Sequence, residues 1–204
     1  MPIEYFQSAR PDAPGLILIH GYGRDLNAMT PLALLAQRTG YAVMSLTLRG
    51  HEGGAYRDFD AEDWLQTLGD IGAARSALEA EGVSADNMAV IGVDIGANLA
   101  LHFALDQPDI VALVMISPGK SLKGVPSTGL MSAYGNRPVL LMASQGDTYA
   151  ASTCMVLKEE AEGQCEFREY AGTYQGHDLL DGVPTVPDQI MLWLKPIMGL
   201  EEPK

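Results

Sequence analysis

Hydrophobic residues along this chain gather in short unbroken runs that are separated by longer segments of mixed character. The runs cover residues 15–19, 41–46, 88–93, 110–116 and 138–143. Apolar runs of this length, without polar alternation, are typical of strands that are covered on both faces. A looser alternation over residues 3–7 predicts an edge strand, and residues 165–170 are expected to form the last strand.

Helices are expected in the segments between these strands. They are predicted over residues 30–38, 61–81, 95–107, 148–162 and 187–194. For the first of them, Pro31 is placed at a first helical position and Gly40 just past the end. The remaining long segments are predicted to be loops: 117–137, with one short helix, and 171–186.

Strands and helices therefore alternate from one end of the chain to the other. Such alternation is typical of βαβ units with right-handed crossovers. The sequence predicts an α/β fold with three layers, in which a mostly parallel, doubly wound sheet carries helices on both faces. All 204 residues, 1–204, are expected to form a single domain.

The stretch from 87 to 105 organises the rest of this fold. It predicts a buried strand, a very tight turn at Asp94 and a helix that begins at Ile95. Gly92 and Gly96 flank Asp94 at two residues on either side, where a Cβ would crowd a strand that turns at once into a helix. This pattern resembles the G-x-S-x-G nucleophile elbow of the α/β hydrolases, with Asp in place of Ser.

Other polar residues also follow directly on predicted strands. They are His20, Tyr22, Asp147 and His177. Because parallel strands end at the same edge of a sheet, where ligands bind, these residues are expected to meet Asp94 there. The order nucleophile, acid, histidine suits Asp94 as nucleophile, Asp147 as orienting acid and His177 as base. The backbone N–H groups of Tyr22 and Ile95 are expected to form an oxyanion hole, and His20 to hold the loop.

The chain is similar to the α/β-hydrolase superfamily, and more narrowly to its small members without a cap, the dienelactone-hydrolase-like or lysophospholipase-like esterases. The matching motifs are HGYGRD (20–25), LRGHEGG (48–54), VIGVDIGANLAL (90–101), SPG (117–119), GD (146–147) and QGHD (175–178). The resemblance implies hydrolysis of carboxylic esters or thioesters through an acyl-enzyme. The chain departs from the family pattern at Asp94, at Asp178 where Gly is frequent, and in having only 19 residues before His20.

Asp94 leaves three functional interpretations open. A carboxylate that attacked an ester carbonyl would form an anhydride, so the first is an esterase whose nucleophile has been replaced. The second is a catalytically inactive hydrolase that binds a ligand or protein. The third is a dehalogenase-like or epoxide-hydrolase-like enzyme with an Asp nucleophile, although Ile95 stands where dehalogenases have Trp and 117–137 is short for a cap. Tyr134 is a candidate acid for that chemistry.

Composition and charge limit the classes of ligand and partner that are expected for this chain. The net charge of −13 excludes a basic nucleic-acid surface, and no run approaches the roughly 18 apolar residues of a membrane span. A cytoplasmic protein that acts on a small molecule, an ester by resemblance, is therefore expected. No cofactor is expected, because Leu26 breaks the G-x-G-x-x-G pattern, and no metal, because the triad explains the spacing of the candidate ligands.

Two expectations concern individual side chains. Two carboxylates beside His177 are expected to raise its pKa, which would make it a poor base at neutral pH. Asp94 and Asp147 each also stand at a helix start, where a capping role is the simpler interpretation.

Overall fold

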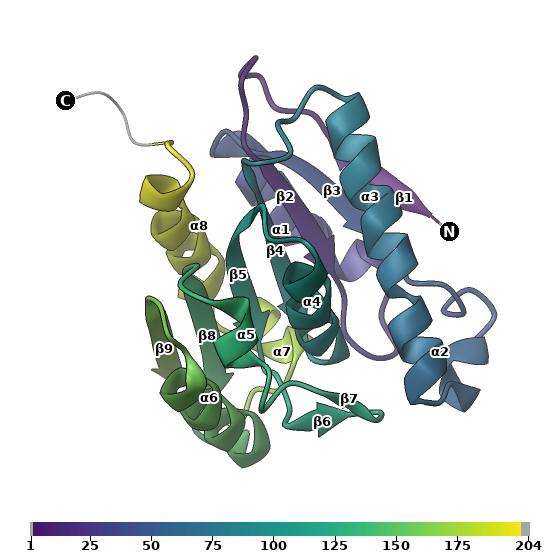
Figure 1. Cartoon of the computed structure of the whole chain (residues 1–204), viewed down its shortest axis with the longest axis vertical. Coiled ribbons are helices and arrows are strands. Elements are labelled where there is room, and N and C mark those ends of the chain that lie inside the picture. The colour runs from purple at the N-terminus through teal and green to yellow at the C-terminus, as the bar shows by residue number, and fades with distance from the viewer. Residues whose placement is uncertain (1, 201–204) are drawn as a thin grey trace.

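A computed structural model describes residues 2–200, and its centre is a seven-stranded sheet (Figure 1). The strands are β1 (Ile3–Phe6), β2 (Gly15–Ile19), β3 (Ala42–Leu46), β4 (Met88–Val93), β5 (Ile110–Ile116), β8 (Val139–Ser144) and β9 (Cys165–Tyr170). Their order is β1-β3-β2-β4-β5-β8-β9, and every pair is parallel except β1 with β3. β4, which leads into Asp94, is thus the middle strand.

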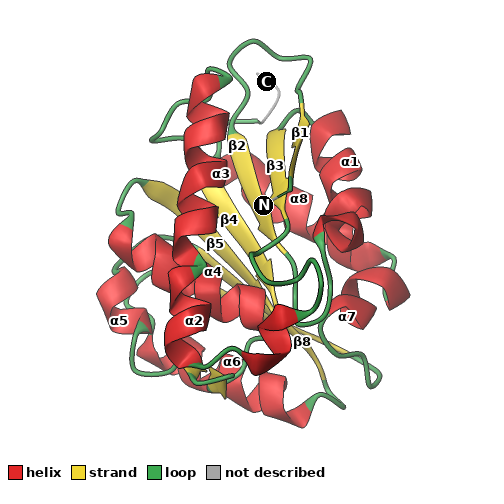
Figure 2. Ribbon diagram, turned by 90° about the vertical axis from the view of Figure 1, so that its right-hand side faces the viewer, coloured by secondary structure: helices red, strands yellow, loops and turns green. Residues whose placement is uncertain are grey.

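Helices cover both faces of this sheet, as Figure 2 shows with the strands between two helical layers. The helices are α1 (Thr30–Arg38), α2 (Ala61–Gln66), α3 (Leu68–Ala80), α4 (Ile95–Asp106), α5 (Met131–Tyr134), α6 (Thr148–Glu160), α7 (His177–Gly182) and α8 (Thr185–Ile197). Two 3₁₀ helices, Leu26–Met29 and Ala55–Asp58, lie in the loops after β2 and β3. These layers confirm the predicted three-layer α/β architecture with a mostly parallel sheet.

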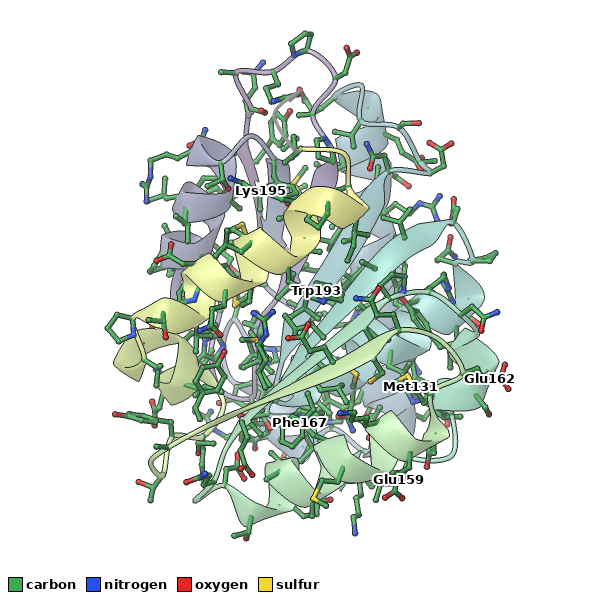
Figure 3. All side chains as sticks on the ribbon, turned by 90° about the vertical axis from the view of Figure 1, so that its left-hand side faces the viewer. Met131, Glu159, Glu162, Phe167, Trp193 and Lys195 are labelled. Carbon is green, nitrogen blue, oxygen red and sulfur yellow. The ribbon has the colours of Figure 1, made fainter. Side chains whose placement is uncertain are left out.

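Two hydrophobic clusters fill the spaces between the layers. One joins the sheet to α3, α4 and α6, and the other joins the opposite face to α1, α7 and α8. Alternate residues of β4 enter alternate clusters, Val90 the first and Ile91 the second, as the pleat requires. Figure 3 shows α8, which carries the buried Trp193, lying across the second face.

Three predicted segments differ in the structure. The single helix expected over 61–81 is two helices that part at Thr67, whose buried hydroxyl donates to the Trp64 carbonyl at 2.6 Å. The loop 171–186 contains α7, so His177 begins a helix. The loop 117–137 contains, besides α5, a small hairpin of β6 (Ser121–Leu122) and β7 (Val125–Pro126).

The hairpin and α7 lie at the end of the sheet where the parallel strands finish (Figure 1). Asn98 of α4 holds the hairpin, since its amide donates to the carbonyls of Gly119 and Val125, both at 2.8 Å. Within residues 2–200 nothing larger than this hairpin covers the site, and none of the described helices is long and apolar enough to span a membrane.

Candidate active site

Asp94 lies in the tight turn between β4 and α4, with φ 54° and ψ −122°, in the left-handed region that side chains rarely adopt. The flanking glycines allow this turn. A Cβ on Gly92 would lie 2.1 Å from the Gly96 carbonyl oxygen, and a Cβ on Gly96 would lie 2.4 Å from that of His20. The structure therefore contains the very tight strand-to-helix turn that the glycine spacing predicted, and Asp94 in this turn lines a cavity.

The Asp94 carboxylate occupies the predicted oxyanion hole. Its Oδ2 accepts a hydrogen bond from the Tyr22 N–H at 3.0 Å, and the Ile95 N–H also favours its charged form. Asp94 makes no side-chain capping bond to α4. Both donors that were expected to bind a substrate oxygen thus act on the protein's own carboxylate, and Asp94 lines the adjacent cavity.

Burial is the main cause that raises the pKa of Asp94 above its ordinary value, and the charge of Asp147 raises it further. The N–H groups of Tyr22 and Ile95 and the more distant Lys123 act in the opposite direction. The Lys123 ammonium lies 4.1 Å from the centre of the Tyr22 ring. The site therefore holds a carboxylate that its surroundings stabilise incompletely.

His177 lines the same cavity as Asp94 and is bound to the loop that follows β2. The Gly21 N–H donates to its Nε2 at 2.9 Å, so Nε2 is an acceptor and the ring proton is assigned to Nδ1. Nδ1 is buried and has no hydrogen-bond partner in the protein. The imidazole lines the same cavity as Asp94, but the lone pair that a general base would need is engaged by the Gly21 N–H.

The pKa of His177 is lowered to about 4, contrary to the rise expected from two neighbouring carboxylates. Burial is the largest cause, because His177 is only 4% exposed, and the Arg24 charge adds to it; Asp181 and Asp178 oppose them. The expectation was wrong because it counted charges and omitted desolvation, which disfavours the imidazolium. His177 is consequently neutral at pH 7.

Asp147 makes the bond of a helix cap in this structure. Its Oδ1 accepts from the Ala150 N–H at 3.2 Å, at the first turn of α6. Among the described residues no hydrogen bond joins it to His177, whose Nδ1 it was expected to orient. Asp147 nevertheless lines the same cavity as Asp94 and His177.

That cavity has a volume of about 430 Å³. Sequence analysis missed some of its walls, namely Gly21, Arg24, Ser117, Tyr149 and Gln175. Ser117 is notable, since it follows β5 with a φ of 48°, is 5% exposed, and has a buried Oγ without a partner. The Ser-Pro-Gly sequence directly after a buried strand was the available signal.

Two further expectations concern residues near the cavity. His20 connects the loop after β2 to the loop after β3. Its Nδ1 lies 2.8 Å from the Gly21 carbonyl, and its Nε2 accepts a hydrogen bond from the Leu48 N–H at 3.1 Å. Tyr134 was considered as an acid, but it is 2% exposed in α5, with its hydroxyl 3.4 Å from the Pro138 carbonyl, and it does not line the cavity. In the part of the chain that the structure describes, no three acidic, His or Cys side chains gather to hold a metal ion.

A family model described as "Alpha/beta hydrolase family" matches residues 16–196. The chain belongs to the α/β-hydrolase family. A thermostable monoacylglycerol lipase of Bacillus sp. (strain H-257) is 27% identical over 115 residues, which are 54% of this chain and 43% of the lipase. The matching region thus spans less than half of that relative's length.

Solved structures confirm the fold. A carboxylesterase structure from Nitrososphaera gargenis has a TM-score of 0.77 at 15% identity, over 97% of this α/β hydrolase and 95% of the other chain. A dienelactone hydrolase from Anabaena variabilis has a TM-score of 0.73 at 16% identity, over 92% and 88% of the two chains. At such identities the likeness concerns architecture. The family and its esterase and lipase relatives support a hydrolase.

The two buried histidines make the stability of this hydrolase depend on pH. The pKa values of His20 and His177 are both lowered to about 4, from 6.5 in an unfolded chain. Between pH 4 and pH 6.5 the unfolded state binds more protons than the folded state. The free energy of unfolding that depends on these two rings being neutral is therefore fully present above pH 6.5 and is lost as the pH falls to about 4.

The variant His177→Gln cannot titrate at position 177, so it should not lose this contribution in acid. Between pH 7 and pH 4, we expect its free energy of unfolding to rise by about 2–3 kcal/mol relative to that of the parent protein. Urea unfolding of both proteins at several pH values measures this difference, and the large net charge cancels in the comparison. A constant difference would show that the ring is not buried in its neutral form.

Proposed function

We propose that this α/β hydrolase uses Asp94 as a nucleophile on saturated carbon, and that its substrates are compounds such as alkyl halides or epoxides. The observation that carries the proposal is the hydrogen bond from the Tyr22 N–H to Asp94 Oδ2. It holds one carboxylate oxygen on a backbone N–H, and Asp94 lines the cavity, so the other oxygen, Oδ1, is the one that we propose attacks the substrate. This is the arrangement that a two-step displacement requires.

In the first step Oδ1 attacks the carbon, and the bond to the leaving group breaks with its electron pair. A halide departs, or an epoxide opens to an alkoxide that then takes a proton from solvent water. Asp94 is now an alkyl ester. Water attacks its Cγ and gives up a proton to His177, and the negative charge of the tetrahedral intermediate develops on Oδ2. The Tyr22 N–H already donates to that oxygen, so this donor does not have to move. Collapse of the intermediate releases the alcohol, which takes the proton from His177, and leaves Asp94 as a carboxylic acid. Loss of that proton to solvent restores the carboxylate.

Ester hydrolysis has no comparable route in this form of the site. The carbonyl oxygen of an ester would need the N–H groups of Tyr22 and Ile95 that the Asp94 carboxylate engages, and attack by Oδ1 on that carbonyl would give an anhydride. The same geometry that suits displacement at saturated carbon therefore obstructs acyl transfer.

The second step is expected to be slow. Nε2 of His177 must release the Gly21 N–H before it can take a proton from water, and a pKa of about 4 makes the imidazole a weak base. The alkyl-enzyme should accumulate, which makes it detectable.

The test is intact-protein mass spectrometry after incubation with 1-bromobutane or 1,2-epoxyhexane, followed by peptide mapping. We expect an adduct on Asp94, more of it in His177→Gln, and none in Asp94→Asn. In ¹⁸O-labelled water, a single turnover should place the label in the Asp94 carboxylate and not in the alcohol. Absence of both adduct and alcohol would refute the proposal.

A second candidate is an ester hydrolase scaffold that Asp94 keeps inactive and that retains ligand binding. The relative named as a monoacylglycerol lipase favours this ancestry, and the Gly21 bond to Nε2 of His177 favours inactivity. This candidate predicts no adduct with alkyl electrophiles, together with esterase activity once Asp94 is replaced by Ser.

A further inference from the structure

The wall of the cavity beside Asp94 contains polar atoms that the proposed reaction does not use. Ser117 and Asp147 stand at the ends of the neighbouring strands β5 and β8, and both line the cavity although they are only 5% and 8% exposed. The Ser117 Oγ has no partner in the protein. An unpartnered buried hydroxyl is costly, so its position in a cavity wall points to a ligand that bonds to it.

The charges around the cavity specify the kind of ligand. Its lining contains three carboxylates, those of Asp94, Asp147 and Asp178, against one guanidinium, that of Arg24. Arg24 lies 3.8 Å from Asp178, and both are exposed at the mouth. The two inner carboxylates therefore lack a cationic partner on the wall, and they are close enough for the charge of Asp147 to raise the pKa of Asp94.

The geometry points to a subsite for a primary ammonium group, held by the Asp147 carboxylate and the Ser117 hydroxyl, with the Asp94 carboxylate lining the same cavity. An ammonium group carries three donors and no acceptor, which suits three oxygen acceptors. Its charge would relieve the repulsion between the two carboxylates. The ligand is thus a small amine.

The other walls fit the body of such a ligand. Leu122 and Pro118 contribute apolar surface, and the ring of Tyr149 stands beside them. The Tyr149 hydroxyl is tied to both the N–H and the carbonyl of Ser121 at 3.1 Å, which fixes the hairpin as a wall. A cavity of about 430 Å³ accommodates an amine with a short alkyl or aromatic body.

This inference deepens the proposed function. Only its catalytic consequence, that the preferred electrophile carries an amino group, rests on that proposed function. Binding of the amine itself does not depend on the reaction. Experiments can therefore refute the amine subsite and the proposed reaction independently of each other.

The test is a titration of the ¹⁵N-labelled protein with benzylammonium chloride, followed by amide chemical shifts at neutral pH. We expect saturable shifts around Asp147 and Ser117, and benzyl alcohol to bind at least ~10-fold more weakly, because hydrogen bonds to charged groups are the stronger ones. Asp147→Asn should weaken benzylammonium binding by at least ~10-fold and Ser117→Ala by ~3-fold or more. Asn retains the capping bond to α6, so the fold should survive.

Asp188→Asn is the control for net charge, because Asp188 is exposed on α8 and does not line the cavity. It should change binding by less than ~2-fold, as long-range surface charge is screened. Equal binding of the amine and the alcohol, or unchanged binding in Asp147→Asn, would overturn the inference. So would potassium or magnesium chloride that produced the same saturable shifts at the same concentrations. Benzylammonium binding without any Asp94 adduct would leave the subsite standing and refute the proposed reaction.

Discussion

Asp94→Ser is expected to hydrolyse short p-nitrophenyl esters at least ~100-fold faster than the chain with Asp94. The substitution removes the carboxylate whose Oδ2 accepts the Tyr22 N–H at 3.0 Å and thereby frees the oxyanion hole. Loss of one oxyanion donor costs roughly 10²–10³ in rate where it has been measured, so release of the hole should give a gain of that order. The serine hydroxyl would also stand next to His177, which is neutral at pH 7.

The same substitution should abolish formation of the alkyl adduct at residue 94. A single substitution should therefore remove the reaction with alkyl electrophiles and introduce ester hydrolysis. Asp94→Ala is the matched control, because it frees the hole and supplies no nucleophile. The double variant Asp94→Ser with His177→Gln tests the base. If Asp94→Ser were no faster than Asp94→Ala, His177 would not reach the elbow, and the bond between Gly21 and Nε2 would be the reason to examine first.

Gly92→Ala is expected to cost more than about 3 kcal/mol of unfolding free energy, and to lower the Tm by roughly 6–12 °C. The added methyl group would lie 2.1 Å from the Gly96 carbonyl oxygen and 2.7 Å from the Ala97 Cα. Both obstacles are backbone atoms at the start of α4, so the helix itself would have to move. Thermal and urea unfolding measure the effect.

Gly72→Ala provides the control for this prediction. Gly72 lies inside α3, and a Cβ there would meet nothing within 4 Å. Because Ala is the better helix former, this variant should gain about 0.5–1 kcal/mol. A loss of less than about 1 kcal/mol in Gly92→Ala would mean that the turn at Asp94 is not as tight as the structure has it.

Much of the fold could be predicted because its signals are local. Unbroken apolar runs marked the buried strands, and the five-residue stretch from Gly92 to Gly96 marked the turn, since both depend on residues within a few positions of one another. The break at Thr67 was missed because apolar spacing continues across it. The hairpin after β5 was missed because its two-residue strands are too short to show a pattern.

The candidate site was predictable as a set of positions. Because parallel strands end at one edge, Asp94, Asp147 and His177 were expected together, and all three line one cavity. Their roles were not predictable, since hydrogen bonds between them depend on side-chain orientation. Asp147 turns toward the Ala150 N–H of its own helix, and Nδ1 of His177 has no partner.

The sequence by itself therefore determined the alternation of strands and helices in an α/β fold and the tight turn at Asp94, because periodicity and glycine spacing act locally. Only the tertiary structure decided that the Tyr22 N–H binds the Asp94 carboxylate, that the Gly21 N–H binds His177, and that burial lowers the pKa of His177 to about 4. Those properties arise from desolvation and from contacts between segments as distant as Gly21 and His177, which no local pattern encodes.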